Sequence, residues 1–512
     1  MAERDATLSL HSRTDAPPLS WGRRVAAFAL LAVALICVFL LERRFDGLAV
    51  ETTAVGPTPV TIYRPARDVP APLVIVAHGF GGSRQMMDQI AVTLARAGFV
   101  VGSLDLPGHG RSDSLMSPDV TVIEGTTMQL VAAVREVAET LRARPDVAGP
   151  ISFVGHSMAT DVAIRAAAET EGVAAVGAVS MYSEAVTADF PESLLIVSGA
   201  SEGHLREVGL DALRLIDPAA KEGAVVANDA ARRMALSAWG VGHVGALYHQ
   251  TTLEGLARWL AGAADARGPI RADLTGVAAG LLFAALALLA SFAARAIPAG
   301  GAATAALPRK TFLIALAAPI PFAFAAAVFA PGAIGGVLGF GSLIAALLAW
   351  GAVQLFALHR CGAPVSRPDP LAIVATLAMG VVFALAMDRY GGAFLPTGQR
   401  LSVMAMLVVA TVPFMLADAR LMAGAPMWRR FAGRIPIIVT LSLAMALAPT
   451  EMGLTFTVLP VMALFFLVFG LFQRVVTERR GQVGGWSGAG LASGVMLAWA
   501  LASTTPLFAA IA

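Results

Sequence analysis

A serine within a pattern of small residues is the strongest chemical signal in the chain. The sequence Gly-His-Ser-Met-Ala at residues 155–159 follows a short apolar run at 151–154 and precedes a segment of helical periodicity at about 160–169. A Gly-x-Ser-x-small pattern between a strand and a helix is typical of a nucleophile elbow, a strained turn that exposes the serine hydroxyl above a sheet edge. Ala159 stands where a second glycine is more common. The pattern predicts Ser157 as a nucleophile.

A serine hydroxyl is a weak nucleophile, so it needs a histidine base, and that base needs an orienting carboxylate. His243 ends the glycine-rich stretch Gly-Val-Gly-His after an expected strand at 234–239, and Glu202 ends the loop Gly-Ala-Ser-Glu after an expected strand at 193–198. The order serine, acid, histidine is the one that follows a nucleophile elbow. We therefore predict Glu202 as the acid and His243 as the base.

Other residues compete for these two roles. Glu184 follows the preceding strand, and Asp229 lies shortly before the last one, so both are alternative acids. Two histidines are weaker candidates for the base, because His249 falls in a helical stretch and His204 lies beside the predicted acid.

Four motifs in the right order resemble those of α/β-hydrolases of the lipase and esterase kind. They are His-Gly-Phe at 78–80, Asp-Leu-Pro-Gly-His-Gly at 105–110, Gly-His-Ser-Met at 155–158 and Gly-His at 242–243, within a resemblance that covers residues 50–262. The resemblance implies Ser157 as nucleophile, His243 as base, and an oxyanion hole formed by the backbone N–H groups of Phe80 and Met158. Glutamate in place of the more usual aspartate, at residue 202, is a departure from the pattern.

The elements that must position these residues alternate between apolar strands and helices. We expect strands at 72–77, 99–104, 151–154, 176–182, 193–198 and 234–239, and helices at 123–143, 160–169 and 253–260. Such alternation predicts a mostly parallel sheet with helices on both faces. Only about ten residues separate the strand at 176–182 from the next, so we expect a minimal cap over the site.

The rest of the chain has the composition of a membrane protein. The sequence is 57% hydrophobic and only 14% charged, and the apolar excess lies near the N-terminus and after residue 272. A membrane-spanning helix needs about 20 apolar residues. We predict a tail at 1–24, an anchor at 25–41, the α/β-hydrolase domain at 45–270, and a polytopic membrane domain of about eight helices at 273–512. A cleaved signal peptide is the alternative to the anchor, but charges follow its apolar run at once.

Arginines predict the orientation, because positive residues concentrate in cytoplasmic loops. With the N-terminus inside, the inner loops hold most of them and the outer loops hold only Arg389 and Arg400. This orientation places the hydrolase domain outside the cytoplasm, which in a bacterium with two membranes is the periplasmic side of the inner membrane. The spans contain almost no ionisable residue in mid-membrane, which argues against transport chemistry.

Charge and motif content exclude several classes of function. The formal net charge is only +2, which argues against nucleic acid as a partner. The sequence has no Cys/His spacing for a metal and no phosphate-cradling loop, so we expect no metal and no cofactor. We predict a membrane-anchored serine hydrolase that cleaves a carboxylic ester, with a lipid or another amphiphile favoured as substrate. An acyltransferase with the same acyl-enzyme and a non-catalytic binding module of a membrane protein are the alternatives.

Overall fold

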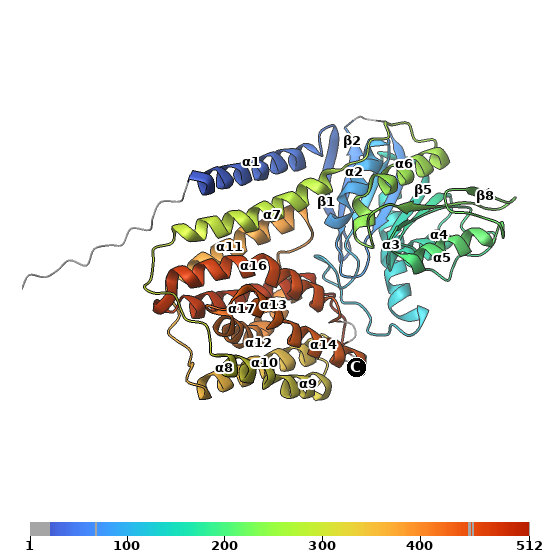
Figure 1. Ribbon diagram of the computed structural model, residues 1–512. Helices are drawn as coiled ribbons and strands as arrows, with labels where there is room; N and C mark the ends of the chain where they lie inside the picture. Colours follow the sequence, from blue (N-terminus) through green and yellow to red (C-terminus); the bar gives the residue numbers. More distant parts are fainter. Residues whose placement is uncertain (1–20, 67–68, 449–451, 453–454, 511–512) are drawn as a thin grey trace, which may run out of the picture.

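The computed structural model describes residues 21–66, 69–448, 452 and 455–510. A sheet domain lies at one end of a set of long helices, most of which run side by side (Figure 1).

One sheet of nine strands forms the centre of the first part, in the order β1-β2-β4-β3-β5-β6-β7-β9-β8. The strands are β1 (Leu48–Val55), β2 (Thr58–Pro65), β3 (Ala71–Ala77), β4 (Val100–Leu104), β5 (Val147–His156), β6 (Val173–Val179), β7 (Ser193–Gly199), β8 (Val225–Ala227) and β9 (Arg232–Ala238). From β4 through β9 neighbouring strands pair in parallel, while β1, β2 and β8 are joined by antiparallel pairs. The carboxyl ends of the central strands therefore meet at one edge of the sheet.

Helices cover both faces of the sheet because its central strands are apolar on both sides. The helices are α2 (Asp88–Arg96), α3 (Met128–Arg142), α4 (Ala159–Ala168), α5 (Gly203–Arg214) and α6 (Gln250–Ala264). In β3, Leu73 and Ile75 face a core shared with α3, α4 and α5, while Val74 and Val76 face a second core shared with α2 and α6. Single-turn helices η1 (Arg84–Met87), η2 (Ile123–Thr127) and η3 (Gly245–Tyr248) lie in the connections.

The predicted fold class is confirmed. The sheet is mostly parallel with helices on both faces, and residues 180–192 between β6 and β7 contain no helix, so the cap is minimal. The strands β1, β2 and β8 were not predicted. The exposed positions of β1 and the shortness of β8 leave little apolar pattern to detect.

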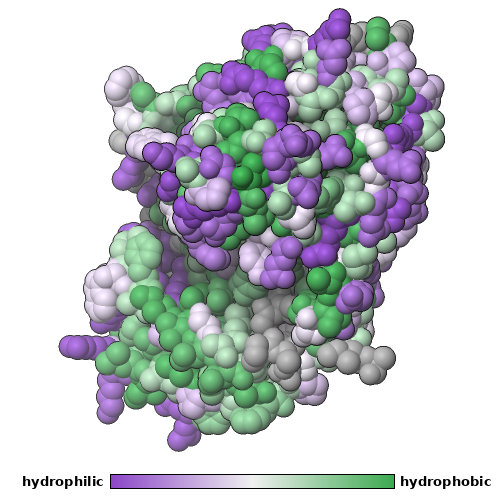
Figure 2. Space-filling model, turned by 90° about the vertical axis from the view of Figure 1, so that its right-hand side faces the viewer, coloured by the Kyte–Doolittle hydropathy of each residue, from purple (hydrophilic) through white to green (hydrophobic). Residues whose placement is uncertain are grey.

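The second part of the chain is all helical. It comprises α7 (Thr275–Ala293), η4 (Ala294–Ala296), α8 (Arg309–Ala317), α9 (Pro319–Phe329), α10 (Phe340–Arg360), α11 (Pro370–Tyr390), α12 (Gln399–Met422), α13 (Met427–Ala432), α14 (Ile435–Leu447), α16 (Val458–Arg480), η6 (Gly481–Val483) and α17 (Gly485–Thr504), and α1 (Trp21–Arg43) lies along α7. Eight helical segments in the described residues are long and apolar enough to cross a membrane. The surface of this helical part in Figure 2 is mostly hydrophobic, unlike the mixed surface of the sheet domain.

Helix α17, which lies within the predicted membrane domain at 273–512, is not among those eight segments. It is buried against α12, α11 and α16 instead of facing outward. Its glycines permit this close packing: a Cβ on Gly494 would lie 2.5 Å from Cα of Val412 in α12. Small residues bring membrane helices together in the same way, at the cost of lower hydropathy.

The C-terminal segment 505–510 joins the helical part to the sheet domain. In the loop after β4, the carbonyl oxygen of Gly108 accepts a hydrogen bond from the backbone N–H of Leu507, and the N–H of Met116 donates to the carbonyl oxygen of Leu507. The side chain of Phe508 is buried in the core of the sheet domain. The two parts therefore share a hydrophobic core next to the loop after β4, which carries the Asp-Leu-Pro-Gly-His-Gly motif.

Candidate active site

Ser157 lies in a strained turn between β5 and α4. Its φ angle is 54°, in the left-handed region that non-glycine residues rarely adopt. A Cβ on Gly155 would lie 2.1 Å from the carbonyl oxygen of Ala159, so the turn requires glycine two residues before the serine. Strain of this kind concentrates at functional sites, and here it directs the hydroxyl away from the sheet and toward His243.

The structure brings the three predicted residues into one hydrogen-bonded chain. Nε2 of His243 lies 2.8 Å from Oγ of Ser157, and Nδ1 of the same ring lies 2.6 Å from Oε1 of Glu202. A carboxylate on Nδ1 holds the proton there and leaves Nε2 free to accept the serine proton. This geometry is the arrangement that a general base requires.

Glu202 is fixed by further donors. Its Oε2 accepts hydrogen bonds from the backbone N–H of Gly199 at 2.6 Å and from Oγ of Ser180 at 2.8 Å. Burial alone would raise the pKa of Glu202, but the hydrogen bonds from His243, Ser180 and Gly199 outweigh it and lower the pKa below its ordinary value. The carboxylate is therefore ionised at neutral pH.

The competing acids and bases lie elsewhere. Glu184 and Asp229 are both exposed, and neither bonds to His243 in the described part of the chain. His249 instead caps α6 by accepting a hydrogen bond from the backbone N–H of Thr251, and His204 is exposed at the start of α5. Of the alternatives that the sequence left open, the geometry favours Glu202 and His243.

Two buried histidines line the site without joining the triad. Burial, together with nearby His243, lowers the pKa of His156 to about 4, and its Nε2 lies 3.2 Å from the carbonyl oxygen of His243. His78 accepts a hydrogen bond on Nε2 from the backbone N–H of Leu106, so its Nδ1 carries the proton and donates to the carbonyl oxygen of Gly79. Both rings are neutral, and their hydrogen bonds hold the loops around the serine in place.

The loop after β3 touches the serine, as an oxyanion hole requires. A Cβ on Gly79 would lie 2.9 Å from Cβ of Ser157, so the backbone of this loop is in van der Waals contact with the turn. The next residue is Phe80, and Met158 follows the serine directly. Among the described residues neither backbone N–H has a hydrogen-bond acceptor in the protein. Both donors are free to bind an oxyanion, the role that the sequence resemblance implied.

The helical part reaches this loop. The ring of Phe80 stacks on Phe456, which precedes α16, with centroids 5.1 Å apart and planes at 12°, and lies 6.0 Å from the ring of Phe508. A Cβ on Gly81 would lie 3.2 Å from Cγ2 of Thr457. The residue predicted to supply an oxyanion donor is thus packed against two side chains from the far end of the chain.

Arg400, at the start of α12, forms hydrogen bonds with the loop after β4, close to the candidate site. Its buried guanidinium donates to the carbonyl oxygens of Gly108 and Gly110, after β4, at 2.8 and 2.9 Å. It also donates to those of Ala502 and Thr505, at the end of α17, at 2.7 and 2.9 Å. One side chain therefore ties the loop after β4 to two helices.

Ser180, Phe456, Phe508 and Arg400 were not predicted from the sequence. Only Ser180 carried a signal, since it follows β6 at the sheet edge where the site had to form. No group of three or more His, Cys, Asp or Glu side chains that could hold a metal occurs within the described residues.

Comparison with known proteins finds similarity over part of the chain. Residues 68–201 match the family described as serine aminopeptidase, S33. The chain is similar to a solved dienelactone hydrolase from Anabaena variabilis at 18% identity, over 42% of this chain and 98% of that one, with a TM-score of 0.32. It is similar to an epoxide hydrolase from an endophytic Streptomyces at 24% identity, over 26% and 38% of the two chains, with a TM-score of 0.21. No curated protein matches the chain.

Proposed function

We propose that this chain, whose globular part is an α/β-hydrolase, is a membrane-anchored serine hydrolase that cleaves carboxylic esters through an acyl-enzyme on Ser157. The observation that carries the proposal is the hydrogen-bonded chain from Ser157 Oγ through His243 to Glu202. A hydrolase-like module without catalysis would have no need to keep this geometry.

The chemistry follows from these positions. His243 Nε2 takes the hydroxyl proton as Oγ of Ser157 attacks the ester carbonyl carbon, and the resulting imidazolium is stabilised by Glu202. The negative oxygen forms beside the N–H groups of Phe80 and Met158, each of which contributes about 10²–10³ in rate. His243 then protonates the departing alcohol. Water, activated by the same base, attacks the acyl-enzyme and releases the acid.

Apolar side chains around the site favour an amphiphilic substrate. Val244, next to His243, is 50% exposed, Phe456, on Phe80, is 53% exposed, and Tyr182, beside the turn after Ser157, is 57% exposed. An acyl chain would cover these surfaces and gain about 25 cal/mol per Å² of apolar area removed from water. The minimal cap leaves room for such a chain to approach from the helical part.

We further propose that the helices span a membrane with the N-terminus inside and the sheet domain outside. The arginine distribution supports this orientation. A cysteine at the exposed position of Glu192, in a background without Cys37 and Cys361, should react with an impermeant maleimide in cells whose outer membrane has been permeabilised. Labelling only after cell lysis would contradict the orientation.

Activity on p-nitrophenyl esters of graded chain length tests the function. Purified protein should hydrolyse these esters with a rising kcat/KM from the butyrate to the longer chains, and Ser157→Ala should abolish the activity. A preference for acetate would refute the amphiphile assignment, and full activity of Ser157→Ala would refute the mechanism. Hydroxamate formation with added hydroxylamine would report transfer of the acyl group to an acceptor other than water.

A further inference from the structure

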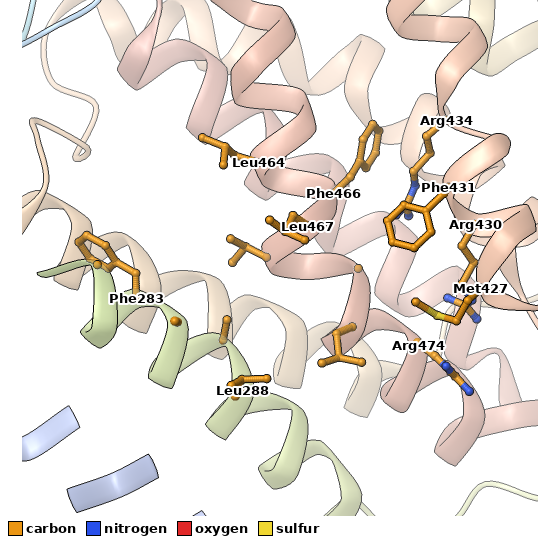
Figure 3. Close-up of a pocket in the computed structure, with 16 residues that line it drawn as sticks. Phe283, Leu288, Met427, Arg430, Phe431, Arg434, Leu464, Phe466, Leu467 and Arg474 are labelled. Carbon is orange, nitrogen blue, oxygen red and sulfur yellow. The ribbon is translucent and has the colours of Figure 1, made fainter. Parts of the chain in front are cut away.

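A groove on the flank of the helical part has no lining residue in common with the candidate active site. It has a volume of about 630 Å³ and is lined by residues of α7, α13 and α16 and by Arg434, just before α14. Figure 3 shows its two sides: Phe283, Leu288, Leu464 and Leu467 on one, and the arginines Arg430, Arg434 and Arg474 on the other. The groove is therefore amphipathic: apolar side chains line one side, and the other side carries three arginines among Met427, Phe431 and Phe466.

The groove matches the depth of one bilayer leaflet. Helix α16 begins beside the sheet domain, where Thr457 contacts Gly81, so its C-terminal end with Arg474 lies on the opposite side of the bundle. Leu464 and Arg474 are ten positions apart on α16, which corresponds to about 15 Å at 1.5 Å per residue. This is half of a hydrocarbon layer of about 30 Å. With α16 across the membrane as proposed above, the end of the groove at Arg474 lies at the membrane surface away from the hydrolase domain.

The three arginines differ in their partners. Arg434 is paired with Asp418 at 2.7 Å, and Arg474 with Glu478 at 2.6 Å. Arg430 instead donates only through Nε, to the carbonyl oxygen of Ala425 at 3.0 Å. In the described part of the chain neither of its Nη groups has an acceptor.

Arg430 is nevertheless only 8% exposed. A guanidinium with so little exposure is costly unless an acceptor or an anion pairs with it. The unpaired Nη groups of Arg430 therefore lie beside apolar side chains of the groove. An anionic group attached to a hydrocarbon chain would accept hydrogen bonds from both Nη groups while its chain covers the apolar side.

We propose that the groove binds one anionic phospholipid of the leaflet opposite the hydrolase domain. Its phosphate lies against the Nη groups of Arg430 with Arg474 beside it, and an acyl chain runs along α7 and α16 past Leu464. Basic pockets between membrane helices on the cytoplasmic side bind anionic headgroups in this way. The proposal rests on the proposed membrane embedding of the helices and is independent of catalysis at Ser157.

Native mass spectrometry of the full-length protein tests the proposal. The protein is released from nanodiscs that contain equal amounts of phosphatidylglycerol and phosphatidylcholine. It should retain one phosphatidylglycerol in preference to phosphatidylcholine, and Arg430→Gln should lower this retention about fivefold, the factor for one arginine near an anionic headgroup. Ala284→Trp, which fills the groove from α7, should exclude both lipids.

Two matched variants serve as controls. Arg360→Gln removes an exposed arginine at the end of α10, on the same side of the bundle, and Leu313→Trp adds the same ring on an outward-facing position of α8. Both should bind lipid as the unmodified protein does. Glycerol 3-phosphate alone should not bind at millimolar concentration, because it lacks the acyl chain.

Three results would overturn the proposal: equal retention of the two lipids, equal losses in Arg430→Gln and Arg360→Gln, or unchanged retention in Ala284→Trp. Extraction of the chain from membranes by alkaline carbonate would refute membrane embedding itself, so the two failures are distinguishable. Ester hydrolysis in all four variants should remain within twofold of the unmodified protein's in detergent.

Discussion

Replacing Glu202 with glutamine should reverse the tautomer of His243. In the structure Oε2 of Glu202 accepts from Gly199 at 2.6 Å and from Ser180 at 2.8 Å. A backbone N–H can only donate, so the carbonyl oxygen of the glutamine must take that position. Its NH₂ group then faces Nδ1 of His243, which lies 2.6 Å from Oε1 in the unmodified protein.

The amide nitrogen can only donate, so Nδ1 of His243 must lose its proton and Nε2 must gain one. The Nε2 atom, 2.8 Å from Ser157 Oγ, can then no longer accept the serine proton. The same exchange in another serine triad lowers kcat by about 10⁴-fold, equivalent to about 5 kcal/mol of transition-state stabilisation. We expect a loss of this size in kcat for Glu202→Gln.

The assay is steady-state hydrolysis of a p-nitrophenyl ester. The KM should change little and the thermal midpoint should fall by only a few degrees, because two of the three hydrogen bonds to residue 202 are kept. Glu184→Gln, at an exposed position, is the matched control and should retain full activity. A kcat for Glu202→Gln within tenfold of the unmodified value, or an equal loss in Glu184→Gln, would refute the assignment of the acid.

Three further changes test the surroundings of the site. Gly79→Ala should lower kcat by about 10²–10³, because the new Cβ would lie 2.9 Å from Cβ of Ser157 and push the oxyanion loop away. Gly203→Ala, with open space around its Cβ, is the control and should keep full activity; equal activities of the two variants would contradict this role of the loop. Arg400→Met removes four hydrogen bonds to carbonyl oxygens and should destabilise the protein by about 3–5 kcal/mol. The loss should appear as a lower melting temperature and faster tryptic cleavage; an unchanged melting temperature would argue against a stabilising role for Arg400. The pKa of His156 is lowered to about 4, so between about pH 6.5 and 4 the unfolded chain binds a proton at this residue that the folded chain does not, and stability falls as the pH falls. His156→Gln should therefore flatten the decline in melting temperature from pH 7 to 4.5. An equally steep decline in the variant would count against a buried neutral ring.

The local geometry of the candidate site was predictable because each residue follows a strand of a parallel sheet. The elbow at Ser157 and the loops that end at Glu202 and His243 come after β5, β7 and β9, whose carboxyl ends meet at one edge. Loop position and residue type were therefore sufficient to assemble the candidate triad, although they left Glu184 and Asp229 open as alternative acids.

The contribution of the helical part was not predictable from the sequence. Phe456 and Phe508 are apolar residues in an apolar region, so nothing marks them as neighbours of Phe80. Arg400 was interpreted only as one of two positive residues on the outer side. The structure gives both of these arginines partners: Arg400 donates to four carbonyl oxygens, and Arg389 pairs with Glu42, near the end of α1, at 2.7 Å. Contacts between residues hundreds of positions apart leave no periodicity or spacing to detect.

Labelling with a fluorophosphonate probe tests most directly whether Ser157 is an activated nucleophile. The probe reacts with a serine only when a neighbouring base removes its proton. After digestion, peptide mass spectrometry should find one phosphonylated serine in the full-length protein, at residue 157, with labelling lost in Ser157→Ala and reduced in Glu202→Gln. A folded protein that stays unlabelled, or one labelled at a different serine, would contradict the account.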